Sequence, residues 1–263
     1  MSNSALVVHR GARLVTREEL DSVQTPPSTE TWFPLAHSHV LETTLATLEQ
    51  AGFRSNRTQL ALSRGDSQFF GTIDLESPIV EGVSLAVGVR NSIDKSLPIA
   101  FAAGERIFIC DNLAFRGEVV VARKHTRFGA DRFAEAMVTA VAGLAQFQQA
   151  EAERIHTFRR TEIADTVAES LILRAYERQI VSHYMLPRVL AGWRQPAFEG
   201  FADRTLWSLE NVFTGALAHV AKSNPQRFCG LTIALQGLLS QAAGSSDEAV
   251  LPARVNRLCP SER

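Results

Sequence analysis

The chain has 263 residues, of which 45% are apolar and 21% are charged, and its formal net charge is −1. This composition is typical of a globular protein with a substantial core, and it excludes a disordered chain or a strongly basic one that seeks polyanions. No apolar run approaches the ~20 residues of a membrane span, and the N-terminus lacks the apolar core of a secretory signal. The three cysteines lie far apart without CxxC spacing, which favours a reducing compartment. We therefore expect a cytoplasmic protein that does not enter a membrane.

The N-terminal part predicts an arm followed by a helix. Three prolines between residues 26 and 34 favour an extended conformation over a helix. Apolar residues then recur at helical spacing over residues 40–48. Ser38 is placed to cap this helix and Gly52 to end it.

The apolar period changes from about 3.6 to two over residues 58–126. Short linkers with glycine or proline separate the apolar runs, and none is long enough for a parallel crossover. The runs that we read as strands include QFFGTIDLE, VSLAVGVRN, IAFAA, RIFIC and EVVVAR. We therefore expect an antiparallel meander of about five strands.

Helical periodicity returns at Ala130 and continues to residue 242. The pattern predicts a long helix with a break near Thr161, several shorter helices, and a last helix with Asn224 as its cap and Pro225 at its first position.

The predicted fold class is α+β: an antiparallel β-meander of about five strands, preceded by one helix and followed by a set of α-helices. We expect an N-terminal arm over residues 1–35, a single domain over residues 36–242 and a flexible tail over residues 243–263. Within the domain, residues 58–126 are strand-rich and residues 130–242 are helical.

Familiar catalytic and cofactor motifs are missing from the sequence: there is no P-loop, dinucleotide fingerprint, HExxH, GxSxG or zinc-ligand spacing. We therefore assign no cofactor, no metal and no catalytic residue. His37 and His39 could share one ion in a strand, because residues two apart point to the same face. At a helix start that geometry is lost, and we interpret them as neighbours of the cap.

The middle of the chain is its basic part, since residues 83–132 carry eight Lys/Arg and five Asp/Glu. Arginine can hold phosphate as a bidentate fork and lysine as a point charge, and nearby phenylalanines could stack on bases. The alternative is an exposed basic turn that binds nothing. The candidate nucleic-acid-binding residues are Arg90, Lys95, Arg123, Lys124 and Arg127.

Two polar clusters each end an apolar strand-like run, at residues 90–95 and 110–112. Asparagine and aspartate at a strand end often build turns, because their side chains bond the local backbone. If both clusters lie at the same edge of the sheet, they would instead form one polar pocket. The candidate pocket residues are Asn91, Ser92, Asp94, Asp111, Asn112 and His125.

These residues carry a family resemblance. The stretch GVRNSIDKSLPIAFAAGERIFICDNLAF, followed by RKHT and later by WSLENVFT, resembles the phage/plasmid-like proteins called domain of unknown function 932. The resemblance runs from about His39 to Ala221 and implies a phage, plasmid or other mobile-element context. That family tends to have histidine where this chain has Ile93, which weakens any metal or general-base role at that position.

Two functions remain open. The first is a non-catalytic DNA-associated protein, with single-stranded nucleic acid as partner. The predicted order of elements is similar to that of phage annealing proteins, which implies a homo-oligomer. The second is an enzyme acting on an anionic substrate held by Arg90 and Lys95, with Asp94 or His125 as base.

Overall fold

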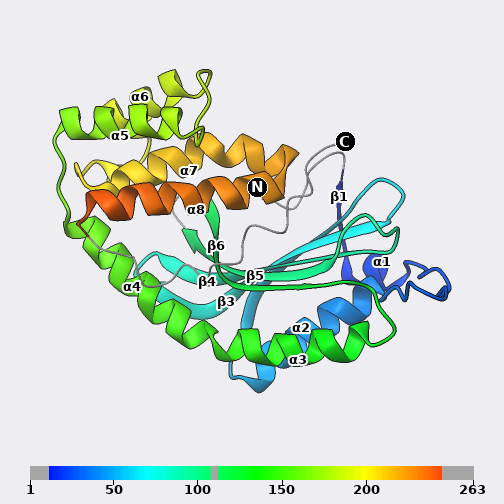
Figure 1. Ribbon diagram of the computed structural model, residues 1–263. Helices are drawn as coiled ribbons and strands as arrows, with labels where there is room; N and C mark the ends of the chain where they lie inside the picture. The colour runs from blue at the N-terminus through cyan, green and yellow to red at the C-terminus, as the bar shows by residue number, and fades with distance from the viewer. Residues whose placement is uncertain (1–11, 108–111, 245–263) are drawn as a thin grey trace.

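The computed structural model describes residues 12–107 and 112–244 (Figure 1). Its strands are β1 (Arg13–Val15), β2 (Ser55–Leu62), β3 (Gln68–Val80), β4 (Val83–Ser92), β5 (Ile99–Ile107) and β6 (Asn112–Arg123). Its helices are α1 (Arg17–Asp21), α2 (His37–Gln50), α3 (Gly129–Ala142), α4 (Leu144–Arg160), α5 (Asp165–Glu177), α6 (Leu186–Arg194), α7 (Leu206–Ser223) and α8 (Pro225–Ala242), with a 3₁₀ turn at Glu199–Phe201. The predicted α+β class is confirmed.

The strands form one antiparallel sheet in the order β1-β2-β3-β4-β5-β6. The predicted antiparallel meander is confirmed as β2–β6, but its divisions differ. The predicted strands IAFAA and RIFIC do not form two strands, because residues 99–107 are one strand, β5, and β2 is not among the runs named above. The sequence did not indicate β1, which pairs with residues 60–62 of β2 at the edge of the sheet. The predicted arm over residues 1–35 is therefore wrong for residues 13–21, because β1 and α1 belong to the folded domain.

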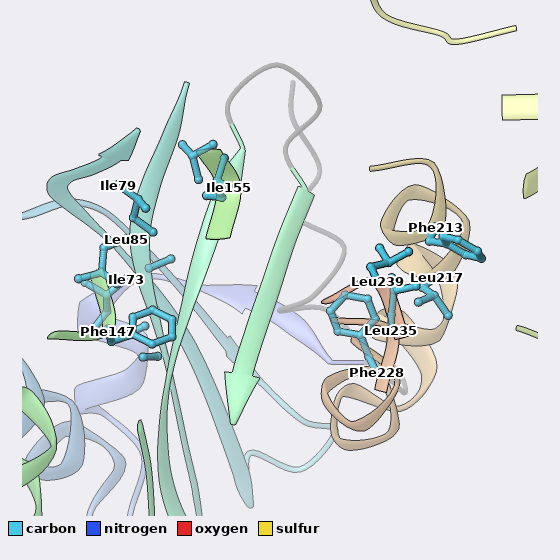
Figure 2. Packing of buried hydrophobic residues seen from close by; sticks show 14 of the residues in the cluster. Ile73, Ile79, Leu85, Phe147, Ile155, Phe213, Leu217, Phe228, Leu235 and Leu239 are labelled. Carbon is cyan, nitrogen blue, oxygen red and sulfur yellow. The ribbon is translucent and has the colours of Figure 1, made fainter. Parts of the chain in front are cut away.

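One face of the sheet, which we call the helix face, carries the large apolar side chains. Along β4, Val83, Leu85, Val87 and Val89 point to this face and are buried. Helices α2, α3 and α4 cover it (Figure 1). In Figure 2, Phe147 and Ile155 of α4 lie beside Ile73, Ile79 and Leu85 of the sheet. This face therefore holds much of the core.

The opposite face of β2–β5, which we call the open face, has a different composition. Its residues on β4 and β5 are mostly glycine and alanine, and we find no extensive packing of a described helix on it. Helices α7 and α8 instead lie along β6, and their own apolar side chains pack together in Figure 2. The open face of β4 and β5 thus lacks the large apolar side chains that pack against helices on the other face.

The helices follow the predicted period, with one helix divided, one predicted cap wrong and one predicted cap confirmed. The predicted long helix is divided at Gly143 into α3 and α4, and α4 ends at the predicted break, with Thr161 as its C-cap. Ser38 lies inside α2, whose N-cap position is Ala36, so the predicted Ser38 cap is wrong. Asn224 caps α8 as predicted, because its side chain accepts a hydrogen bond from the backbone N–H of Arg227 at 3.0 Å.

A buried ion cluster joins the sheet to the helices. The Arg154 guanidinium on α4 donates to Glu151 at 2.9 Å, to Glu210 on α7 at 2.8 Å and to Glu105 on β5 at 3.2 Å. The side chain of Arg154 is only 8% exposed and those of the three glutamates 2%. Although burial lowers the pKa of Arg154, the three carboxylates together raise it well above its ordinary value. The cluster ties three separate segments of the chain together.

In the described part of the chain, every helix is too short or too polar to cross a bilayer.

Candidate functional site

The register of the sheet brings three connections to one end of it. Gln68 pairs with Ser92 at the end of β4, and Ile99 at the start of β5 pairs with Arg123 at the end of β6. The β2–β3 turn, the β4–β5 loop and the segment after β6 are therefore neighbours, at the end of the sheet beside α1 in Figure 1. We call this region the basic end, and its exposed cationic residues are Arg64, Lys95, Arg123, Lys124 and Arg127.

The carboxylates of the same connections take part in local interactions. Asp66 of the β2–β3 turn lies 3.3 Å from the guanidinium of Arg13. Asp94 of the β4–β5 loop accepts hydrogen bonds from the hydroxyl groups of Ser67, at 2.7 Å, and Ser96. Hydrogen bonds from hydroxyl groups leave the charge of Asp94 in place, but the five cations outnumber these two carboxylates, so the basic end carries an excess of positive charge.

Aromatic rings accompany the cations. Phe128 is 56% exposed, and the guanidinium of Arg132 lies 6.0 Å from its ring centroid. The ammonium of Lys95 lies 5.1 Å from the ring centroid of Trp32, which comes from the segment before α2. Cations held over rings in this way are weakly attracted to them. An exposed ring beside exposed cations is the combination with which proteins bind single strands.

The polar residues of the β4–β5 loop build a turn. The hydroxyl of Ser92 donates to the Leu97 carbonyl at 2.8 Å and accepts from the Leu97 N–H at 3.0 Å. Asp94 also accepts from the backbone N–H of Ser96 at 3.0 Å. Partial burial raises the pKa of Asp94, but the hydrogen bonds from Ser96 and Ser67 outweigh this and lower it. Asp94 is thus held ionised as a turn residue.

Asn91 joins β4 to the start of α2. Its amide nitrogen donates to the Leu35 carbonyl at 2.8 Å and lies 3.0 Å from Nδ1 of His37. Nε2 of His37 lies 3.1 Å from the Asp66 carbonyl and must donate to it. Both ring nitrogens of His37 are therefore engaged, with the proton on Nε2. Burial lowers the pKa of His37, so the ring stays neutral.

His125 lies beneath the segment that precedes α2. It is only 6% exposed, its ring centroid is 6.4 Å from that of Trp32, and its carbonyl accepts from the Phe33 N–H at 3.1 Å. In the described part of the chain, neither ring nitrogen of His125 has a hydrogen-bond partner. Burial lowers the pKa of His125, and the nearby carbonyls of Phe33 and Leu97 oppose this only in part. A surface ligand cannot reach this ring unless the covering segment moves.

The predicted polar pocket is wrong for Asn112. Asn112 pairs with Ile107 at the opposite end of β5 from Ile99. Eight residue steps along the strand separate the two ends by roughly 26 Å. Asp111 lies outside the described residues. The other predicted pocket residues do lie together at the basic end, where Asn91, Ser92 and Asp94 support the loop and His125 is covered.

The predicted cations are brought to one end of the sheet but not to one face. Arg90 pairs with Phe70 and Ala100, and its half-buried side chain points to the open face. Arg123 pairs with Ile99, whose side chain belongs to the helix face. Lys95, Lys124 and Arg127 lie in the connections beyond the strands.

Sequence reasoning missed Arg64, Trp32 and His37 as parts of this region. One signal was available, since successive connections of a meander alternate between its two ends. The turn at residues 63–67, the loop at residues 93–98 and the segment after β6 must then share an end, and the β5–β6 connection must lie at the other. Trp32 and His37 carry no such signal, because their positions depend on how the chain before α2 packs.

Comparisons with known proteins add no relatives. No protein-family model matches the chain, and neither a curated protein nor a solved structure matches it. The resemblance to phage/plasmid-like proteins therefore stays a prediction. Within residues 12–107 and 112–244, no group of three or more histidine, cysteine, aspartate or glutamate residues is arranged to hold a metal ion.

Proposed function

We propose that this protein binds single-stranded nucleic acid, without catalysis, through the phosphate-contacting residues Lys95, Arg123, Lys124 and Arg127 of the basic end. The pairing of Ile99 with Arg123 carries the proposal, because it brings the β4–β5 loop beside the segment that follows β6. Residues that are about 30 positions apart in the sequence then lie at the same end of the sheet. Arg64 of the β2–β3 turn extends it.

A flexible single strand fits this surface better than a compact anion would. The cations are exposed and spread over three connections, which suits a chain of phosphates that can follow them. Exposed Phe128 offers a ring on which a base can stack without regard to sequence. Because the net charge of the whole chain is only −1, we expect moderate, salt-sensitive affinity.

The resemblance to phage/plasmid-like proteins agrees with a role on mobile DNA, and self-association of the kind seen in annealing proteins is part of the same proposal. The alternative of an enzyme at the strand ends has less support. Asp94, one proposed base, is held by hydrogen bonds from Ser67 and Ser96, and His125, the other, is buried beneath Trp32.

Fluorescence anisotropy with a labelled single-stranded oligonucleotide tests the proposal. The wild type should bind at low salt, and the double variant Arg123→Ala/Lys124→Ala should bind more weakly to every sequence tried. The matched control is Arg160→Ala/Arg188→Ala, which removes two exposed charges from the helical half. Equal loss in both double variants would mean that only overall charge matters, and no binding by the wild type would refute the proposal.

A further inference from the structure

On β4 and β5 the open face is lined mainly by glycine and alanine. Gln59, Thr72, Gly88 and Ala102 lie opposite one another across β2, β3, β4 and β5, and directly paired residues of antiparallel strands point to the same face. The neighbouring row toward the basic end contains Ala61, Phe70, Arg90 and Ala100. On β4 and β5, only Arg90 among these residues has a side chain larger than a methyl group. A flat object could therefore lie close to the backbone here.

Buried polar atoms without partners lie on the same face. The side-chain oxygens Oε1 of Gln59 and Oγ1 of Thr72 are buried and have no hydrogen-bond partner, and the two residues pair directly across β2 and β3. Thr72 as a whole is 5% exposed. An unpartnered buried oxygen costs free energy that valine, with the same shape, would avoid at Thr72. A ligand that displaces the groups covering these oxygens would supply the missing hydrogen bonds.

The exposure of the residues on the open face, and the charge of Arg90, indicate which part of this face a ligand can reach. Phe70, Gly88, Arg90, Ala100 and Ala102 are half-buried, whereas Ala61 and Thr72 of the same two rows are buried, as are Asp74 and Ala86 one row further from the basic end. The accessible part of the open face therefore adjoins the basic end. Arg90 adds a cation at the border between the two regions.

We propose that the open face binds the bases of the single strand whose phosphates contact the basic end; this inference rests on the proposed function. A base is a planar ring that can lie on the half-buried glycine and alanine residues of β4 and β5, and its edge would reach the Gln59 and Thr72 oxygens once the groups that cover them move aside. Sheets that bind single strands stack bases on aromatic side chains, and Phe70 is the aromatic residue in the two rows described above. Arg90 would stack on a base or contact the adjoining phosphate.

The test compares two labelled oligonucleotides of equal length, one with bases and one fully abasic, which carry the same number of phosphates. Wild-type protein should bind the base-bearing strand more tightly, by about tenfold for a base that stacks on Phe70. Ala102→Val fills the open face with a residue that favours strands, and it should lower affinity for the base-bearing strand while leaving the abasic strand unchanged. Thr58→Val is the matched control, because Thr58 is exposed and pairs with Ile73 of the helix face.

A second variant keeps the test valid if Ala102→Val folds poorly. Thr72→Val should weaken binding of the base-bearing strand, yet its melting temperature should equal or exceed that of the wild type, because an unpartnered hydroxyl is removed. Equal wild-type affinity for the two oligonucleotides would overturn base binding on the open face and leave the basic end intact as a phosphate site. If neither oligonucleotide binds, the proposed function fails as well.

Discussion

The side-chain amide of Asn91 lies 3.0 Å from Nδ1 of His37 and joins the end of β4 to the first turn of α2. The same amide nitrogen donates to the Leu35 carbonyl, which fixes its orientation and makes Nδ1 of His37 an acceptor. This contact holds the segment before α2 against the basic end, so Trp32 reaches both Lys95 and His125.

Asn91→Leu should destabilise the protein by about 2–3 kcal/mol, because it leaves the Leu35 carbonyl and Nδ1 of His37 buried without a donor. The measurement is urea unfolding at neutral pH. Asn56→Leu, the same change at an exposed residue of β2, is the control and should stay within about 0.5 kcal/mol of the wild type. An equal effect of the two substitutions would mean that the Asn91–His37 contact contributes little.

Stability should fall in mild acid. The pKa values of His37 and His125 are lowered from 6.5 in the folded protein, mainly by burial, so the unfolded chain binds protons first as the pH falls. The stabilisation that comes from keeping these two histidines neutral is therefore fully present above about pH 6.5. It is lost below that pH, by up to about 1.4 kcal/mol per pH unit for each histidine.

Unfolding at about pH 7.5 and about pH 5.5 measures this loss. His125→Leu removes one of the two histidines, together with two unpartnered ring nitrogens, and should reduce the loss without destabilising the protein at neutral pH. An unchanged pH dependence in this variant would show that His125 is not protonated differently in the two states.

Arg154→Met should be among the most destabilising single substitutions. It leaves Glu105, Glu151 and Glu210 buried without their shared cation, and breaking a buried ion cluster costs about 3–5 kcal/mol. Arg160→Met on the exposed surface at the end of the same helix is the control and should change the free energy of unfolding by less than about 0.5 kcal/mol. A small effect of Arg154→Met would mean that the helices hold to the sheet mainly by apolar packing.

Substitutions at Lys95 should change oligonucleotide binding without lowering the stability of the protein. Its backbone has φ +67°, a conformation that asparagine and glycine tolerate better than lysine. Lys95→Asn should therefore leave the melting temperature unchanged or raise it, while weakening oligonucleotide binding and making it less salt-dependent. Lys95→Arg retains the charge and should retain most of the affinity. An equal loss of affinity in both variants would show that the positive charge at position 95 is not what binds the oligonucleotide.

The elements of the fold could be predicted because their causes are local. Alternation along residues 83–89 marked β4 and its buried face, and the Asn224–Pro225 pair marked the start of α8. These patterns arise from strand and helix geometry, and neighbouring residues are enough to establish them. The strand β1 was missed because three residues are too few to show a period.

The site could be predicted only in part, because it depends on contacts between distant residues. Polar residues at strand ends correctly marked the β4–β5 loop, but the position of Asn112 at the other end of the sheet follows only from the order of the strands in the meander, not from its neighbours in the sequence. Glu105, Arg154 and Glu210 each look like surface charges in the sequence, and only their convergence in the fold explains their burial. The open face was hidden for the same reason, since Gln59 and Ala102 become neighbours only through the register.

The salt dependence of single-strand binding tests the role of the basic end most directly. Each phosphate contact releases counterions, so log affinity should fall with log salt at a slope of about −0.7 per contact, or roughly −3 for four or five contacts. Arg123→Ala/Lys124→Ala should make the slope shallower by about 1.4, and Arg160→Ala/Arg188→Ala should leave it unchanged. A wild-type slope near zero, or a full slope in the Arg123→Ala/Lys124→Ala protein, would contradict phosphate binding at the basic end.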